Sequence, residues 1–205
     1  REAGRGPAVK VAAIQMVSST RLADNLARAG ALIAEAAASG AELAVLPEYF
    51  CLMGQRDTDK LTIQEAFGDG PIQQFLAQSA SMHGLWLVGG TLPLAAQAPD
   101  AMASTGRVFN SSLVYTPDGR CTARYDKMHL FRFDNGIERH DESRVLCAGA
   151  LPRMFELPSR DGHLWRIGLS VCYDLRFAEL YRHYAALGAD LLLVPSAFTH
   201  ATGQA

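Results

Sequence analysis

Short apolar runs alternate with amphipathic segments along most of the chain, and this order predicts an α/β fold. Residues 9–16 (VKVAAIQM) predict a buried strand, and apolar residues then recur at helical spacing over residues 22–36. Gly40 is typical of a helix end, and residues 43–46 (LAVL) predict the next buried strand. A strand, a helix and a second strand in this order are typical of a βαβ unit.

The middle of the chain adds a further helix, a strand and a hairpin. Residues 71–84 predict a helix, because a proline suits its first turn and a glycine suits its end. Residues 85–94 (LWLVGGTLPL) predict a strand with a glycine pair at its middle. Residues 109–115 and 121–125 flank a Pro-Asp-Gly turn, so we expect a hairpin there. Residues 128–151 have little periodicity and predict a long loop, which in a compact domain is usually functional.

The last part of the chain returns to the α/β order. It predicts a strand at residues 167–171, a helix at 177–187 and a strand at 191–194. Because no linker or repeat divides the sequence, we expect one domain over residues 9–205, behind a flexible segment at residues 1–8.

Composition and charge argue against several classes of protein. Lysine and arginine number 19 against 21 acidic residues, and this balance does not favour a nucleic-acid partner. Hydrophobic residues make up 49% of the chain, which is typical of a globular domain. No apolar run approaches the ~20 residues of a membrane span. The four cysteines form no C-x-x-C pair, which favours a reducing compartment, so we expect a cytoplasmic location.

Three chemically active side chains follow predicted strands: Glu48, Lys127 and Cys172. Ligands of α/β sheets bind at the carboxyl ends of strands, so we expect these residues to converge. Together they offer a nucleophilic thiolate, a carboxylate that moves protons and an ammonium that stabilises negative charge. Because Cys172 stands between a strand and a helix start, we expect the helix dipole to lower its pKa.

Other interpretations of these residues stay open. Cys172 could be an inert buried thiol, and Glu48 and Lys127 could be ordinary solvated charges. His129, two residues beyond Lys127, could instead form a Cys-His dyad. Histidines at metal-ligand spacing and glycine-rich phosphate loops are both missing from the sequence, so we expect neither a metal nor a cofactor.

At these segments the sequence resembles the nitrilase, or carbon-nitrogen hydrolase, superfamily. The matching motifs are LAVLPEYF around Glu48, YDKMHLF around Lys127 and GLSVCYDLRFAEL around Cys172. VAAIQM, GGTLP, FNSSLVYTPDG and LLLVPSAF are also similar to that superfamily. The resemblance implies a four-layer α-β-β-α sandwich, which here would lack its C-terminal part, and assembly into homodimers or higher homo-oligomers.

The resemblance also implies roles for particular residues. Glu48, Lys127 and Cys172 would form a Glu-Lys-Cys triad, in which Glu48 is the general base and Cys172 the nucleophile. Lys127 and the backbone N–H of Tyr173 would hold the oxyanion. Glu142 matches a second glutamate of the superfamily, which would orient Lys127 or the substrate.

Within the superfamily, CYDLRFAEL most resembles the omega-amidase and deaminated-glutathione-amidase branch. Nitrilases usually carry tryptophan and glutamate where this chain has Tyr173 and Asp174. Arg176 is a candidate carboxylate clamp, because guanidinium binds carboxylate in bidentate fashion; the alternative is a salt bridge to Glu179 or to another structural carboxylate.

The resemblance therefore implies a thiol amidohydrolase for small, linear, carboxylate-bearing amides, acting through a cysteine acyl-enzyme. The alternatives are a nitrilase, an N-carbamoyl-amino-acid hydrolase and a catalytically silent member that binds a small metabolite.

Overall fold

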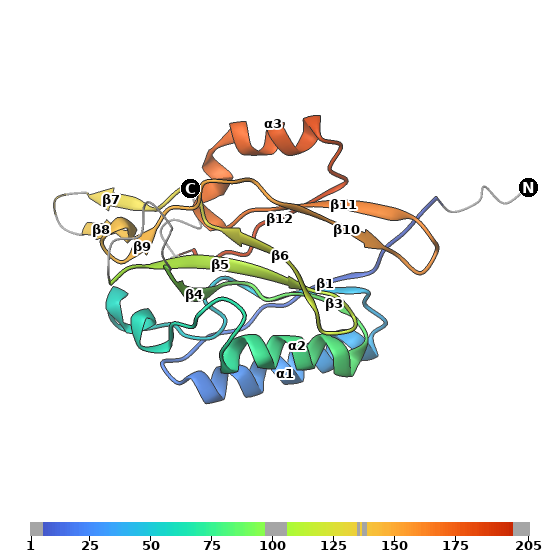
Figure 1. Ribbon diagram of the computed structural model, residues 1–205, viewed down its shortest axis with the longest axis horizontal. Coiled ribbons are helices and arrows are strands. Elements are labelled where there is room, and N and C mark those ends of the chain that lie inside the picture. Colours follow the sequence, from blue (N-terminus) through green and yellow to red (C-terminus); the bar gives the residue numbers. More distant parts are fainter. Residues whose placement is uncertain (1–5, 97–105, 135, 137–138, 199–205) are drawn as a thin grey trace, which may run out of the picture.

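The elements of this protein stack in four layers, two of helix and two of sheet (Figure 1). The computed structural model describes residues 6–96, 106–134, 136 and 139–198. In these residues α1 and α2 underlie a seven-stranded sheet, and a three-stranded sheet lies between it and α3. The predicted α-β-β-α sandwich is thus confirmed. Residues 1–5, part of the predicted flexible segment, lie outside the described residues.

The helices and strands have the following bounds. The helices are α1 (Leu22–Ala38), α2 (Pro71–His83) and α3 (Ala178–Ala186), with short 3-10 helices η1 (Asp57–Ile63), η2 (Glu142–Arg144) and η3 (Cys172–Arg176). The larger sheet holds β1 (Val11–Ala13), β2 (Leu43–Val45), β3 (Trp86–Val88), β4 (Leu92–Ala95), β5 (Val108–Tyr115), β6 (Cys121–Asp126) and β9 (Leu146–Cys147). The smaller sheets hold β10 (Met154–Pro158), β11 (Leu164–Leu169) and β12 (Leu191–Leu193), and β7 (Arg132–Asp134) and β8 (Arg139–Asp141).

Strand pairing confirms the predicted βαβ unit and hairpin. β1 and β2 are parallel neighbours, with Val11 opposite Leu43, and α1 connects them. β5 and β6 pair antiparallel across the Pro-Asp-Gly turn. The glycine pair divides the predicted strand at 85–94 into β3 and β4, which pair one after the other with the same edge of β5, opposite β6.

One sequence prediction about the second half is wrong, and one strand there was not predicted. The segment 128–151 is not a continuous loop, because it holds the β7–β8 hairpin, η2 and β9. These elements are two or three residues long, too short to produce a recognisable period. β10 was not predicted, although Phe155 and Leu157 alternate with exposed residues along it.

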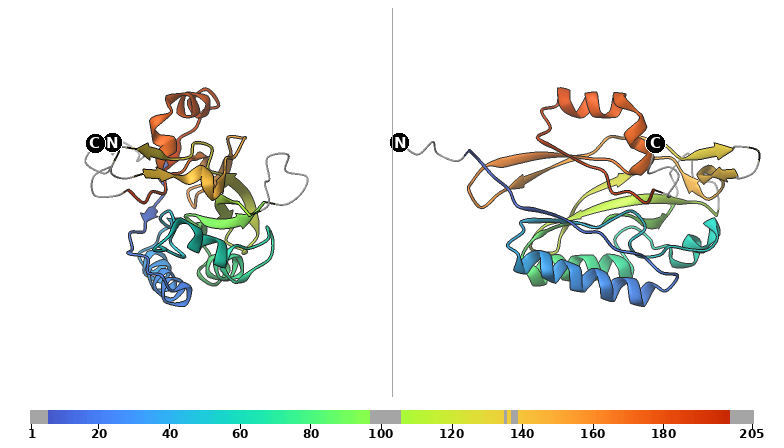
Figure 2. Two further views of the ribbon diagram at one scale, coloured as in Figure 1. Left: turned by 90° about the vertical axis from the view of Figure 1, so that its left-hand side faces the viewer. Right: turned by 180° about the vertical axis from the view of Figure 1, so that it is seen from behind.

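The strands divide their side chains between two cores because successive residues of a strand point to opposite faces. Ala44, Leu87 and Leu113 pack with α1 and α2 in the first core. Their neighbours Leu43, Val88 and Val114 pack between the two sheets in the second core. The views in Figure 2 show α1 and α2 side by side under the larger sheet and α3 on the opposite outer face. Within the described residues, no helix is both long enough and apolar enough to cross a membrane.

Gly90 lies where the backbone passes very close to the segment that carries Glu48. It has a φ of 51°, and a Cβ atom there would lie 2.0 Å from the Pro47 carbonyl oxygen. Gly84 has a similar φ of 60° but no atom within 4 Å of such a Cβ. The two positions therefore separate the cost of the left-handed backbone from the cost of the close contact.

We expect Gly84→Ala to lower the free energy of unfolding by about 1 kcal/mol, the cost of a Cβ in this conformation. Gly90→Ala should lower it by at least about 2 kcal/mol more, since rigid backbone atoms must move. Urea denaturation of both variants and the parent measures the difference. Equal losses in the two variants would contradict this close approach.

Candidate active site

The residues singled out by the sequence meet at one end of the sandwich, where β7 and β8 project (Figure 1). Glu48 follows β2, Lys127 directly follows β6, and Cys172 follows β11. A cavity of about 210 Å³ joins them. It is lined by Glu48, Tyr49, Lys127, Phe131, Glu142, Cys172, Tyr173, Arg176, Ala197 and Phe198.

Glu48 is a buried carboxylate whose two oxygens are held by three donors. Oε1 accepts from Asn110 Nδ2 at 2.9 Å and lies 3.3 Å from Lys127 Nζ. Oε2 accepts from the backbone N–H of Ala197 at 2.9 Å. Burial raises the pKa of Glu48, and the nearby Lys127 ammonium only partly opposes this. The carboxylate is therefore fixed in place and more basic than one in water.

Lys127 is a buried ammonium between two carboxylates. Its Nζ lies 2.9 Å from Glu142 Oε2 and 3.3 Å from Glu48 Oε1. Burial acts to lower the pKa of Lys127, but the charges of Glu48 and Glu142 outweigh it and raise the pKa. The site therefore keeps a permanent positive charge.

Cys172 has a strained backbone that turns its thiol toward Glu48. Its φ of 46° is unfavourable for a residue with a Cβ, and its N–H is held by the Pro195 carbonyl at 2.9 Å. The thiol and the Glu48 carboxylate line the same cavity, and the negative charge of Glu48 acts on the thiol and raises its pKa. Strain of this kind is typical of functional sites, where the surrounding structure maintains it.

The expectation that a helix dipole lowers the pKa of Cys172 is wrong. Burial, and then the negative charge of Glu48, raise the pKa of Cys172 to about 12. The helix that begins at Cys172 is a five-residue 3-10 turn, too short to have a strong dipole. The thiol is therefore neutral near pH 7 and needs a base before it can attack.

Asp174 ties the nucleophile segment to the lysine segment. Its fully buried carboxylate accepts from Tyr125 Oη at 2.6 Å and from the backbone N–H groups of Val171 and His129, both at 2.9 Å. His129 Nδ1 lies 2.7 Å from the same carboxylate. His129 thus contacts Asp174 and does not line the cavity, so the geometry disfavours the Cys-His dyad.

Glu142 fits the supporting position that the sequence suggests. Its Oε2 accepts from the Phe131 N–H at 2.7 Å and from Lys127, and its Oε1 accepts from Tyr49 Oη at 3.4 Å. The motif resemblance pointed to Glu142 but not to Tyr49 or Asn110. Both lie within matched motifs, LAVLPEYF and FNSSLVYTPDG, which was the available signal.

Tyr173 and Arg176 complete the cavity wall. The Tyr173 N–H meets no backbone acceptor in the described part of the chain, so it is available to a ligand. The alternative salt bridge of Arg176 with Glu179 is not formed, because Glu179 pairs with Arg182 at 3.2 Å. The Arg176 guanidinium therefore remains available at the cavity.

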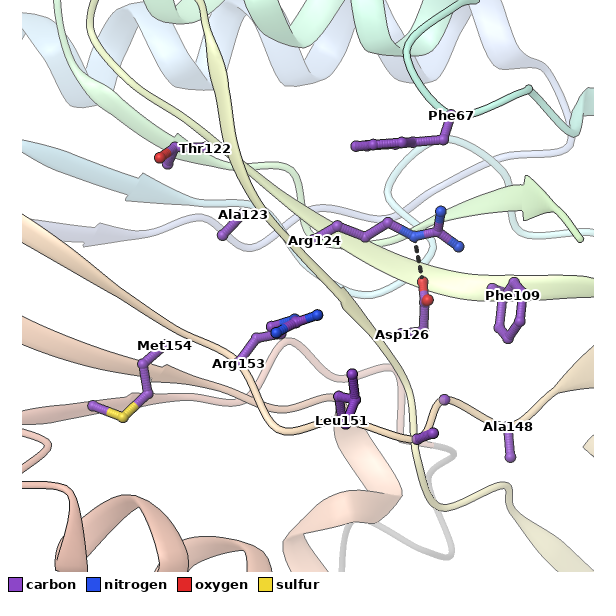
Figure 3. Close-up of a pocket in the computed structure, with 12 residues that line it drawn as sticks. Phe67, Phe109, Thr122, Ala123, Arg124, Asp126, Ala148, Leu151, Arg153 and Met154 are labelled. Carbon is purple, nitrogen blue, oxygen red and sulfur yellow. Dashed lines mark hydrogen bonds and ion pairs between the residues drawn. The ribbon is translucent and has the colours of Figure 1, made fainter. Parts of the chain in front are cut away.

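A larger cavity of about 730 Å³ lies along β6 and shares no lining residue with the first (Figure 3). Arg124 lies in its wall, paired with Asp126 at 2.9 Å and placed over the rings of Phe67 and Phe109. None of the residues lining it is a candidate nucleophile. Within the described residues, no cluster of three or more His, Cys, Asp or Glu side chains is arranged to hold a metal ion. The smaller cavity is therefore the candidate active site.

Comparison with known proteins identifies the family. Residues 10–205 match the family model described as carbon-nitrogen hydrolase. This chain belongs to the carbon-nitrogen hydrolase family. The resemblance inferred from the motifs is thus confirmed.

Three relatives show how far the similarity of this carbon-nitrogen hydrolase extends. It is 36% identical over 197 residues to omega-amidase NIT2 of Danio rerio, covering 96% of this chain and 66% of the relative. It is 35% identical over 195 residues to deaminated glutathione amidase of Synechocystis sp., covering 94% and 68%. Saccharomyces cerevisiae Nit3, a member of branch 10 of the nitrilase superfamily, superposes with a TM-score of 0.76 at 29% identity, covering 96% and 67%. The chain spans about two thirds of the length of the curated relatives.

Proposed function

We propose that this protein is a thiol amidohydrolase that cleaves the C–N bond of a small linear amide. The observation that carries the proposal is that the neutral Cys172 thiol shares one small cavity with the Glu48 carboxylate, which is itself paired with the Lys127 ammonium. A nucleophile, a base with a raised pKa and a fixed positive charge thus lie around one cavity. The relatives named as amidases support the same chemistry.

The first half-reaction forms an acyl-enzyme. Glu48 takes the proton of Cys172, and the sulfur attacks the amide carbon, so that the C=O electron pair moves to oxygen. Lys127 and the Tyr173 N–H stabilise this oxyanion. The oxyanion then collapses, the C–N bond breaks, and protonated Glu48 gives its proton to the departing nitrogen.

The second half-reaction restores the enzyme. Glu48, again a carboxylate, takes a proton from water, and the resulting hydroxide attacks the thioester carbon. The C–S bond breaks, the carboxylic acid leaves, and the proton on Glu48 returns to the sulfur. One amide and one water become one acid and one amine or ammonia, with no cofactor consumed.

The substrate that fits this site is a short amide with a distal carboxylate. A cavity of about 210 Å³ leaves room for a small molecule only. Arg176 lies in its wall with no carboxylate of the described residues paired to it, and a guanidinium binds carboxylate in bidentate fashion. A distal carboxylate would supply the missing partner.

We also propose a homodimer or higher homo-oligomer in the cytoplasm. Leu175, Leu187 and Leu192 flank α3 and are about half exposed. An interface with a second copy of the chain would remove these apolar side chains from water. The cysteine pattern supports a reducing compartment.

The roles of Lys127 and His129 are tested by substitution. Lys127→Met should lower kcat/KM for amides by about 10³-fold or more, because the oxyanion loses its positive charge. His129→Ala should retain kcat within about an order of magnitude, because Nδ1 is bound to Asp174 and not to the thiol. Ammonia release from a panel of amides measures both. The reverse ranking of the two variants would favour a Cys-His dyad.

The substrate class is tested at Arg176. Arg176→Leu should raise KM for amides with a distal carboxylate by about tenfold or more, and leave neutral amides within about twofold. Arg182→Leu, whose exposed side chain pairs with Glu179 on α3, is the matched control and should change neither. Equal effects on charged and neutral amides would mean that Arg176 is structural. Nitriles and N-carbamoyl amino acids in the same panel distinguish the alternative reactions.

A further inference from the structure

A second ammonium, Lys60, lies behind the triad. Its Nζ is 3.4 Å from the Tyr49 hydroxyl and 4.7 Å from the centre of the Tyr49 ring. The same hydroxyl donates to Glu142 Oε1 at 3.4 Å, and Glu142 Oε2 lies 2.9 Å from Lys127 Nζ. A chain of polar contacts therefore runs from the 3-10 helix η1, which carries Lys60, to the proposed oxyanion donor.

Tyr49 is held in this chain by an unfavourable backbone conformation. Its φ is 55°, and its N–H donates to Oγ1 of the fully buried Thr91 at 2.9 Å. Cys172 is the other non-glycine residue with such a φ in the described part of the chain. A left-handed residue of this size is unfavourable and persists only where the surrounding structure maintains it. The strain at Tyr49, like that at Cys172, lies at the proposed active site.

Lys60 compensates a negative charge of the site. Glu48 and Glu142 carry two negative charges, and Lys127 alone supplies one positive charge in their immediate surroundings. An uncompensated buried charge is strongly destabilising. Burial lowers the pKa of Lys60, whereas the carboxylates of Glu142, Asp57 and Glu48 act to raise it and Lys127 acts to lower it. With Lys60 charged, the two carboxylates of Glu48 and Glu142 are matched by two ammonium groups.

Residue usage agrees with this assignment. The chain has 16 arginines and only three lysines, Lys10, Lys60 and Lys127. Two of the three therefore lie in this network. An ammonium is a compact point charge, which can approach a phenol and a carboxylate network where a planar guanidinium needs more room.

We propose that Lys60 is a positioning residue of this site. Bound to the Tyr49 hydroxyl, it fixes the Glu142 carboxylate through Tyr49, and Glu142 in turn holds the Lys127 ammonium toward the oxyanion. The assignment rests on the proposed amidase function only for the last step. The contacts among Lys60, Tyr49 and Glu142 exist whatever the substrate is.

The kinetic test uses Lys60→Met, Tyr49→Phe and the double variant. Each single variant should lower kcat about tenfold and leave KM within about twofold, and the double variant should be no slower than the worse single one. Lys60→Arg should recover part of the loss, because it restores the charge. Lys10→Met is the control and should match the parent, since Lys10 binds the Ser39 carbonyl on the exposed surface. A rise in KM alone, or fully additive losses, would overturn the proposal.

A second measurement does not depend on turnover. With ¹³Cε-labelled lysine the protein gives three resonances, assigned by Lys10→Arg and Lys60→Met. Glu142→Gln should lower the titration midpoint of Lys60, because it removes a carboxylate that raises it. Tyr49→Phe should shift the Lys60 resonance. If these responses occur without amide turnover, the proposed function fails and the contact network stands. If neither substitution changes the titration midpoint or the position of the Lys60 resonance, the positioning role is wrong even in an active enzyme.

Discussion

The site depends on one buried carboxylate, Glu48, placed between an ammonium and a thiol. Removing such a charge from water costs several kcal/mol unless donors replace the solvent. Here Asn110, Lys127 and the Ala197 N–H supply those donors. These donors come from β5, from the end of β6 and from beyond β12. The binding site of the carboxylate is therefore complete only when these distant segments have assembled. The fold and the chemistry therefore require each other.

The burial that makes the charge of Glu48 costly also changes the proton affinities of the site. It raises the pKa of both Glu48 and Cys172, so the proton stays on sulfur at rest and the neighbouring carboxylate is a stronger base. A permanently ionised thiol would be open to adventitious oxidation and alkylation. Coupling ionisation to a partner that also serves the hydrolytic water confines the reactive state to the catalytic cycle.

Much of the architecture could be predicted from the sequence, because buried strands and amphipathic helices have strong periods. α1, α2 and α3 began and ended near the expected glycines and proline. The β7–β8 hairpin and β9 could not be predicted, because two or three residues carry no period and tertiary contacts decide their pairing. β10 had a visible alternation that was overlooked.

The site was predictable where chemistry and strand ends coincide, which was the case for Glu48, Lys127 and Cys172. The pKa of Cys172 was not predictable, because it depends first on the burial of the sulfur and then on the charge of Glu48, whereas the spacing indicates only that a helix follows. Tyr49 and Lys60 had no distinctive spacing at all. Their contacts depend on the left-handed backbone of Tyr49, which no local sequence pattern predicts.

The central claim is that the Glu48 carboxylate shares the cavity with the Cys172 sulfur and adds to the effect of burial in raising the pKa of Cys172. A pH titration of ¹³Cβ-labelled cysteine in the parent and in Glu48→Gln tests it most directly. Removing the negative charge should lower the pKa of Cys172 from about 12, so that more thiolate forms at a given pH, while amide turnover is lost with the base. A Cys172 pKa that is unchanged or higher in Glu48→Gln would contradict the account.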